Sequence, residues 1–196
     1  MHPELLLLIG ISLSLGFTPG PNNAVASYSG FNFGIKKTIP LIMGTWLGYT
    51  AFVILTIFVL ISTFLKYPVI QEIIRILGTF FLLYLAYKIS FSKTATETER
   101  VNPVKFIETF LFQYLNPKGV MVAIVVVSTY VDPGENYISY ATQVVLLALI
   151  FSGSSITLWT FIGKFLRKFA TNEKFIKYFN YVMSVLLLLS IITFYI

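Results

Sequence analysis

The sequence predicts an all-α membrane protein, because it is too apolar and too poor in charged residues for a water-soluble domain. Of its 196 residues, 57% are hydrophobic and 11% are charged, and the mean hydropathy is +0.83. A soluble domain usually carries about 25% charged residues. Long stretches without Asp, Glu, Lys or Arg support the same class, since about 20 apolar residues form a helix that crosses a bilayer. These charge-free stretches are residues 5–35, 38–65, 136–163 and 178–196.

Six membrane-spanning helices account for nearly the whole chain. The third helix has weaker hydropathy because Glu72, Arg75 and Lys88 flank it, and the fourth because Lys118 interrupts it. The apolar stretches are continuous rather than alternating, which disfavours a β-barrel. The expected helices are residues 4–30, 38–65, 69–90, 106–131, 136–163 and 176–196.

The distribution of basic residues predicts that both termini lie outside. With the N-terminus outside, the inner loops hold eleven basic residues, and the outer loops hold only Lys66 and Arg75. Cytoplasmic loops carry the excess of Lys and Arg in membrane proteins, so this orientation is the expected one. The eleven inner residues are Lys36, Lys37, Lys88, Lys93, Arg100, Lys105, Lys164, Arg167, Lys168, Lys174 and Lys177.

The composition excludes several kinds of site. The chain has no cysteine, which excludes disulfides and cysteine-based metal sites. Its one histidine is His2, so a histidine-rich metal site cannot form, and we expect neither a metal nor a cofactor. The net charge of +6 indicates orientation and contact with anionic membrane lipid rather than nucleic-acid binding. The first 30 residues lack a basic start and an Ala-x-Ala-like cleavage site, so we expect a retained first span.

The two halves of the chain correspond under a shift of 98 residues. The shift carries the stretch 38–65 onto 136–163 and Pro19 onto Pro117, although a coincidence of spacing is the alternative. Three spans per half is an odd number, so the halves would enter the membrane in opposite directions, as in inverted-repeat transporters. We expect a single transporter domain over residues 1–196. Its parts are repeat 1 at about 1–90, a cytoplasmic linker at about 91–105 and repeat 2 at about 106–196.

Prolines interrupt the first expected span in the middle of the membrane. Pro19 and Pro21 remove two backbone donors, and Gly20 between them lets the chain bend, so the helix should break here. The helix from Leu5 to Thr18 would be about 21 Å long, so the break lies inside the hydrocarbon core. Non-helical backbone at that depth must be buried in protein or line a cavity. We therefore expect the break to face the interior of the bundle.

The fourth expected span has a similar interruption. Asn116 before Pro117 is typical of a helix start, because Asn is a favoured N-cap and Pro suits the first helical position. The helix from Phe106 to Pro117 would be about 18 Å long, so this break also lies near mid-depth. Two half-helices, starting near Pro21 and Pro117, would approach each other from opposite membrane faces.

The two breaks predict a binding site for a small polar solute that carries a carboxylate. Each half-helix start has about half a positive charge and unpaired N–H groups, which favour an anion. Lys118 adds a full positive charge at a depth where an unpaired charge is costly. Two proline kinks whose freed groups are satisfied by neighbouring helices are the alternative. The candidate substrate-binding residues are Thr18, Pro19, Gly20, Pro21, Asn22, Asn23, Gln113, Asn116, Pro117 and Lys118.

Small residues in the second and fifth expected spans favour close helix packing. Gly44 and Gly48 form a Gly-x-x-x-Gly pattern, which suits a homodimer face or packing within one chain. Of these two, we expect packing within the chain. The polar stretch from Ser152 to Ser155 either joins helices or lines a pore.

These motifs resemble those of the LysE/RhtB family of amino-acid exporters. Residues 18–22, Thr-Pro-Gly-Pro-Asn, are similar to the family's signature in its first span, and residues 113–118, Gln-Tyr-Leu-Asn-Pro-Lys, to its second signature. The length, the six-span hydropathy and the basic loop from Lys88 to Lys105 also resemble the family. Asn22-Asn23 and residues 128–133 are most similar to the branch that exports cysteine and O-acetylserine.

The resemblance implies a secondary transporter of the bacterial inner membrane that exports small neutral amino acids by proton antiport. The substrates it implies are cysteine and O-acetylserine, or threonine and homoserine. The eight acidic residues lie at span ends or in loops, and Glu108 is the candidate proton carrier, with a charge at the membrane rim as the alternative. A passive channel and a metal-ion exporter are the alternative functions. An intramembrane enzyme is disfavoured, because no embedded nucleophile, acid pair or metal cluster is evident.

Overall fold

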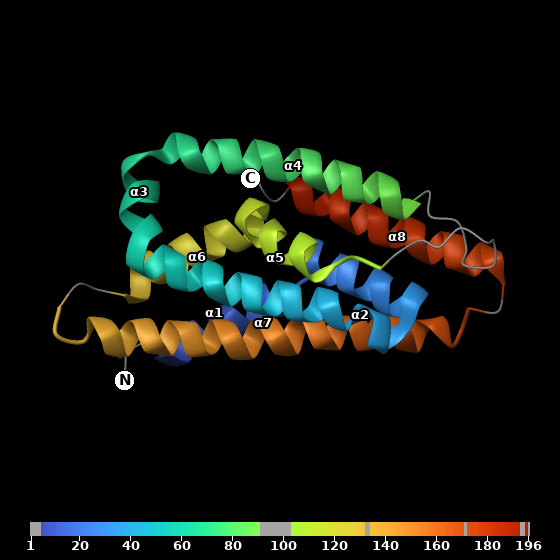
Figure 1. Cartoon of the computed structure of the whole chain (residues 1–196), viewed down its shortest axis with the longest axis horizontal. Helices are drawn as coiled ribbons and strands as arrows, with labels where there is room; N and C mark the ends of the chain where they lie inside the picture. Colours follow the sequence, from blue (N-terminus) through green and yellow to red (C-terminus); the bar gives the residue numbers. More distant parts are fainter. Residues whose placement is uncertain (1–4, 91–102, 132–133, 171, 193–194, 196) are drawn as a thin grey trace.

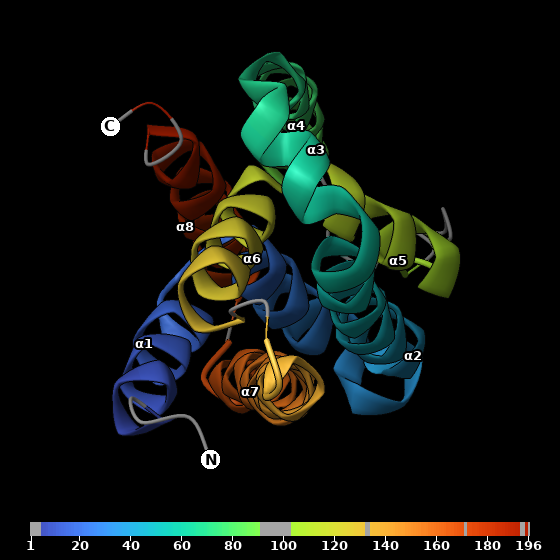
Figure 2. The same cartoon turned by 90° about the vertical axis from the view of Figure 1, so that its left-hand side faces the viewer.

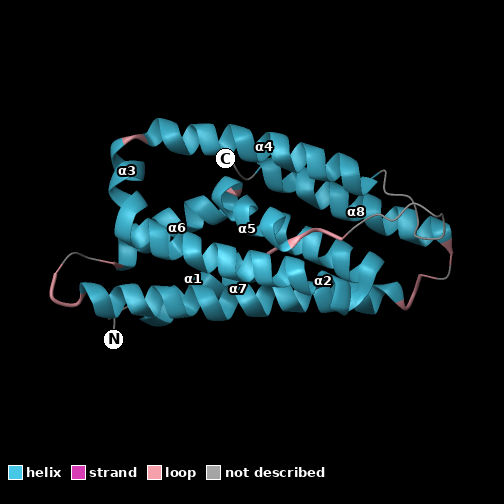
Figure 3. Ribbon diagram, in the orientation of Figure 1, coloured by secondary structure: helices cyan, strands magenta, loops and turns pink. Residues whose placement is uncertain are grey.

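The residues that the structure describes form helices joined by short connections, and no strand occurs among them (Figure 3). The computed structural model describes residues 5–90, 103–131, 134–170, 172–192 and 195. His2 and most of the expected linker, residues 91–102, lie outside the described residues. The elements are α1 (Leu5–Phe17), α2 (Pro21–Leu55), the π-helix η1 (Thr56–Leu60), α3 (Ile61–Lys66), α4 (Pro68–Ser90), α5 (Phe106–Leu115), α6 (Pro117–Tyr130), α7 (Tyr137–Arg167) and α8 (Glu173–Ile192).

The element α2 consists of two helices that run in opposite directions. Gly34 separates them with φ 74° and ψ 173°, a conformation outside the helical region that glycine adopts without strain. Before this turn, the ring of Phe31 lies against the end of α7, where the guanidinium carbon of Arg167 is 5.3 Å from the centroid of the Phe31 ring. After it, the backbone oxygen of Ile57 accepts a hydrogen bond from Tyr137 at the start of α7. The chain therefore turns back along α7 at Gly34 (Figure 1).

The long helices α4, α7 and α8 and the second part of α2 lie roughly parallel to one long axis (Figure 1). The turn at Gly34, the end of α7 and the start of α8 lie together at one end of this axis, which we call the basic end, whereas α5 starts nearer the middle (Figure 1). The described basic residues on or beside the segments at this end are Lys36, Lys37, Lys164, Arg167, Lys168, Lys174 and Lys177.

Helix α6 lies near the centre of the bundle. Seen along the long axis, it is surrounded by α1, α7, α2, α5, α4 and α8 (Figure 2). It contacts α1, α2, α4, α5 and α7, whereas α2 packs most extensively on α7, and α4 on α8. The residues around Pro117, where α6 starts, are therefore enclosed by several helices.

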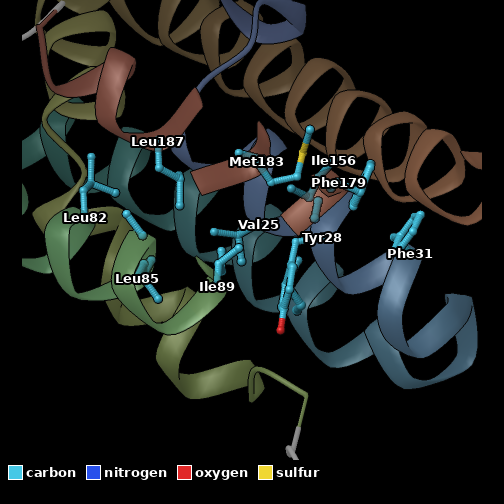
Figure 4. Close-up of a cluster of buried hydrophobic side chains, with 14 of the residues drawn as sticks. Val25, Tyr28, Phe31, Leu82, Leu85, Ile89, Ile156, Phe179, Met183 and Leu187 are labelled. Atoms are coloured by element: carbon cyan, nitrogen blue, oxygen red, sulfur yellow. The ribbon is translucent and has the colours of Figure 1, made fainter. Parts of the chain in front are cut away.

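Two clusters of buried apolar side chains stabilise the two ends of the bundle. The cluster near the basic end joins α2, α4, α7 and α8, and includes Val25, Leu85 and Met183 (Figure 4). In it, Phe31 stacks on Phe179 with ring centroids 3.8 Å apart. The cluster near the other end surrounds α6 and includes Leu8, Phe52, Val53, Val120, Val127, Tyr130 and Val144.

The apolar helices identify a multi-pass membrane protein. Within the described residues, four helical segments are long and apolar enough to cross a membrane, and α5 with α6 form a fifth candidate, bent by 59°. Helix α1 is a shorter apolar helix of 13 residues. Large apolar side chains such as Phe80, Phe161 and Leu6 are exposed, as expected for surfaces that contact lipid.

Glycines allow the helices to cross closely. A side chain at Gly44 would collide with Thr109 and with the backbone oxygen of Phe106, and one at Gly48 would collide with the backbone of Phe110. These neighbours all belong to α5, so the Gly-x-x-x-Gly pattern packs within one chain, as the sequence analysis expected.

We predict that Gly44→Ala destabilises the protein by about 1–3 kcal/mol, because the added methyl group forces α2 and α5 apart. Gly10→Ala is the matched control, since no atom lies within 4 Å of the Cβ it would add. Thermal unfolding in detergent, followed by size-exclusion chromatography, measures both variants. Equal melting temperatures for the two variants would contradict the described crossing.

Candidate functional site

Two connections between helices meet in the middle of the bundle, and each is followed by a helix that begins with proline. Helix α1 ends at Phe17, and α2 begins at Pro21 after an extended Gly20 with φ −165° and ψ −179°. Helix α6 begins at Pro117 after an extended Asn116, and its axis is bent by 59° from that of α5. Proline has no N–H and its ring clashes with the preceding turn, so it suits the first position of a helix better than the interior.

Side chains from α2 and α7 satisfy the backbone oxygens at the end of α1. Asn23 Nδ2 donates to the backbone oxygens of Gly16, at 3.0 Å, and Thr18, at 2.9 Å. Ser155 Oγ donates to the Gly16 oxygen at 2.7 Å and lies 3.2 Å from Asn23 Oδ1. Asn23 is buried, and both its donors and its oxygen are engaged, so its contacts are those of a residue that holds the connection in place.

Lys118 reaches from the first turn of α6 to the connection between α1 and α2. Its ammonium donates to Thr18 Oγ1 at 2.8 Å, and this hydroxyl in turn donates to the backbone oxygen of Leu15 at 3.0 Å. The lysine side chain passes over Gly20, where an added Cβ would lie 3.0 Å from Nζ. Among the described residues, no carboxylate lies within 4.0 Å of this ammonium. The positive charge therefore remains available to an anionic ligand.

A pair of amides joins the first turn of α2 to α5. Asn22 Nδ2 donates to Gln113 Oε1 at 2.8 Å, and Gln113 Nε2 donates back to Asn22 Oδ1 at 3.2 Å. Gln113 Nε2 also donates to the backbone oxygen of Thr109 at 2.8 Å. Gln113 is fully buried, so these bonds satisfy both ends of its amide within the protein.

The two proline-started helices have uncapped N-termini. No described side chain caps the N-terminus of α2 at Gly20 or that of α6 at Asn116. The first-turn N–H groups of a helix have no partner within it and lie at its positive end, so they attract anions. Asn116 Oδ1 is buried and accepts no hydrogen bond from any described residue.

A cavity of about 120 Å³ lies between the two N-termini. A single water needs about 10–15 Å³, so this cavity has room for a small solute. Lys118 is the one charged residue among the described residues that line it. Of the candidate residues, the lining includes Gly20, Pro21, Asn22, Asn23, Asn116 and Lys118.

The other candidate residues lie beside the cavity. Thr18 and Gln113 do not line the cavity, but each is hydrogen-bonded to a residue that does, Thr18 to Lys118 and Gln113 to Asn22. Pro19 is exposed, and Pro117 is buried at the start of α6. Glu108 is exposed on α5 and does not line this cavity. Its carboxylate accepts the backbone N–H of Lys105 at 2.8 Å and so caps the start of α5.

Several lining residues were not among the candidates. Thr45 and Tyr49 of α2 line the polar part of the cavity, and no local sequence signal marks them. Ser152 and Ser155 of α7 also line it, and the unusual polarity of their stretch was the signal that could have identified them. Apart from Ser12, the rest of the lining is apolar and includes Leu8, Val53, Val122, Ala123, Val126, Val127, Val144, Leu147 and Ala148. Among the described residues, no three His, Cys, Asp or Glu side chains are grouped as metal ligands.

Comparisons with known proteins identify the family of the chain. The family described as LysE type translocator matches residues 13–195. A cysteine/O-acetylserine efflux protein of Salmonella typhimurium (strain LT2) is 32% identical over 140 residues, which cover 71% of this chain and 72% of the relative. A protein of the same description from Escherichia coli (strain K12) is 26% identical over 189 residues, 95% of each chain. No solved structure matches the chain.

The match to the family covers nearly the whole chain, including both proline connections and the cavity between them. It confirms the family resemblance that the sequence analysis found in the two signatures. The chain therefore belongs to the LysE family of translocators, which are membrane transporters and not enzymes.

Proposed function

We propose that this transporter exports a small neutral amino acid or a close derivative across the bacterial inner membrane, with the central cavity as its binding site. The observation that carries this proposal is the position of Lys118 and two uncapped helix N-termini around one cavity. All three favour a negative charge in the same small volume. A carboxylate at this point is the interaction that such an arrangement supports best.

The lining of the cavity also favours an uncharged substrate side chain. Apart from Lys118, the described lining carries no charged residue, and much of it is formed by valine, alanine and leucine. A lysine side chain would have to bring its ammonium into this apolar lining without a counter-charge, which is costly. The α-ammonium group of a bound amino acid, by contrast, can donate to Asn116 Oδ1, a buried acceptor at the cavity that has no described hydrogen-bond partner.

The relatives support a particular set of substrates. The relatives described above are named for the efflux of cysteine and O-acetylserine, and both compounds are small and uncharged in the side chain. We therefore propose cysteine and O-acetylserine as the first substrates to test, with threonine and homoserine as the next neutral candidates.

We further propose that the chain crosses the membrane six times in two inverted repeats. In this arrangement, α1 and the first part of α2 form one broken span, and α5 with α6 form the corresponding one. The paths of the helices support it, since α4 and α8 run in opposite directions along the long axis, as do α7 and the second part of α2 (Figure 1). The basic end would face the cytoplasm and both termini the outside, because Lys and Arg gather on the cytoplasmic side.

Proton antiport is the proposed driving reaction, and it follows from the family resemblance. Glu108 is the proposed proton carrier, although its exposed carboxylate also caps the start of α5. A passive channel and a metal-ion exporter are the alternatives that the transport experiment must separate.

We predict that purified protein in liposomes catalyses counterflow of cysteine and O-acetylserine and does not catalyse counterflow of lysine. The experiment loads liposomes with one unlabelled amino acid and measures the uptake of the same labelled compound, across a panel that includes threonine, homoserine and leucine. Empty liposomes provide the background. A response to lysine alone would contradict the neutral-substrate proposal.

A pH gradient in the same liposomes separates an antiporter from a channel. For an antiporter, the gradient drives accumulation of the amino acid above equilibrium, and a protonophore abolishes this accumulation. A channel only equilibrates the amino acid, whether or not the gradient is present. A metal-ion exporter would confer metal resistance on cells that overproduce it and would leave the amino-acid panel without signal.

We predict that Asn22→Ala and Asn116→Ala each abolish export while the protein remains folded and inserted. Each removes a polar side chain that lines the cavity at a proline-started helix. A hydrogen bond to a charged group contributes about 1.5–3 kcal/mol, so a loss of at least about tenfold in transport is the minimum expected. Asn136→Ala is the matched control, because Asn136 is exposed and does not line the cavity. Unchanged transport in both cavity variants would exclude this site.

A further inference from the structure

A second, smaller hollow lies between the central cavity and the basic end. It has a volume of about 20 Å³, and Asn22 and Thr45 line both hollows. We call it the recess, and its described lining is Asn22, Val25, Leu41, Thr45, Phe81, Leu85, Val104, Glu108, Thr109 and Phe112. Glu108 lies in the first turn of α5, and the segment from residue 103 leads into this turn from the side of the basic end (Figure 1). The recess therefore extends from the edge of the substrate cavity towards the proposed cytoplasmic face.

The amide pair of Asn22 and Gln113 meets the two hollows through Asn22, since Gln113 is not among the lining residues of either. Asn22 lines both of them, and its amide is held by both hydrogen bonds to Gln113. Gln113 is fully buried, and Thr109, which accepts its third hydrogen bond, lines the recess. A solute that moved from one hollow to the other would have to pass Asn22 and Thr45, and so would have to displace the Asn22 amide from Gln113.

We infer that the Asn22–Gln113 pair is the barrier that closes the transport path towards the basic end, and that the recess is the collapsed part of this path. This inference rests on the proposed function, since it assigns a pathway to the same site. With about 20 Å³, the recess holds little more than one water, so the path is shut in this structure. Val25, Leu41 and Phe112 close it, and all three are buried.

The chemistry of the pair suits a barrier that opens and closes. Interhelical hydrogen bonds between neutral side chains are weak in membrane proteins, so the pair can separate without unfolding the bundle. A substrate in the central cavity competes with Gln113 for the amide of Asn22, because Asn22 lines that cavity. Because of this competition, the substrate binds the open and closed states with different free energies. A ligand shifts a conformational equilibrium only if its affinity differs between the two states.

The negative charge of Glu108, at the end of the recess that faces away from the central cavity, agrees with a role of the recess as a transport path. Glu108 is exposed there, whereas most of the recess is formed by apolar side chains. A carboxylate at the mouth attracts the ammonium group of an amino acid that approaches from the basic end. Glu108 thus serves the path as an electrostatic guide, whether or not it also carries the proton.

Thiol labelling tests the barrier directly, because the chain has no cysteine of its own. Val25→Cys provides a reporter in the recess, and Ser152→Cys provides one in the central cavity. A membrane-impermeant thiol reagent is added to vesicles of either orientation, so that each face is tested separately. No substrate is needed for this measurement.

With the pair intact, we expect the cysteine at position 25 to react slowly, because Val25 is buried in the collapsed recess, and only from the face of the basic end. Adding Gln113→Leu should make it reactive from the opposite face as well, with a rate increase of about tenfold, the change expected from losing two interhelical hydrogen bonds. Gln143→Leu is the matched control, since Gln143 Nε2 donates to Ser139 on the same helix. The cysteine at position 152 should react from the opposite face in both backgrounds, which demonstrates that the reagent enters the central cavity.

Two results would overturn the inference. One is a cysteine at position 25 that reacts from the opposite face as fast as the one at position 152 while Gln113 is intact. The other is unchanged labelling in Gln113→Leu and in the more conservative Gln113→Asn, with both variants monodisperse by size exclusion. A failure of the proposed function looks different, because counterflow would then be absent for every amino acid while the labelling pattern of the barrier remained.

Discussion

The site depends on one constraint, which is that non-helical backbone inside a membrane must find its hydrogen-bond partners within the protein. In the proposed six-span arrangement the connection from Thr18 to Gly20 lies in the membrane, and Asn23 and Ser155 donate to the backbone oxygens at the end of α1. These bonds fasten α1 to α2 and α7. No described side chain caps the N–H groups at the start of α2. The connection is therefore held at the end of α1, and its N–H groups at the start of α2 are available to a ligand.

Lys118 joins the two proline connections into one site. It was the one basic residue that the orientation of the chain did not explain, and its ammonium lies against Thr18 at the carboxyl end of α1, the negative end of that helix. The same ammonium borders the cavity between the starts of α2 and α6. One side chain thus bridges two segments about 100 residues apart, and the cavity keeps a positive charge without a described carboxylate beside it.

Local sequence rules predicted the helices and the prolines at the site, but not every residue that contacts the cavity. Pro68 and Tyr137 begin α4 and α7 within one residue of the expected starts, 69 and 136. Charged residues and prolines interrupt the apolar stretches at both places and so indicate where each helix starts. The reversal at Gly34 fell in an expected loop, and only its φ of 74° reveals how tight it is. Thr45 and Tyr49 reach the cavity through helix packing, which no local pattern encodes. Asn23 was expected at the substrate; it lines the cavity, and its described bonds also hold the backbone, which the sequence did not indicate.

The central claim is that the cavity recognises a carboxylate, and ligand-induced thermal stabilisation of the purified protein tests it most directly. The measurement compares O-acetylserine with its methyl ester, which lacks the negative charge, for the unaltered chain and for Lys118→Met. The account predicts that the free acid raises the melting temperature of the unaltered chain, that the ester does not, and that Lys118→Met loses the difference. Equal stabilisation by acid and ester in both proteins would contradict it.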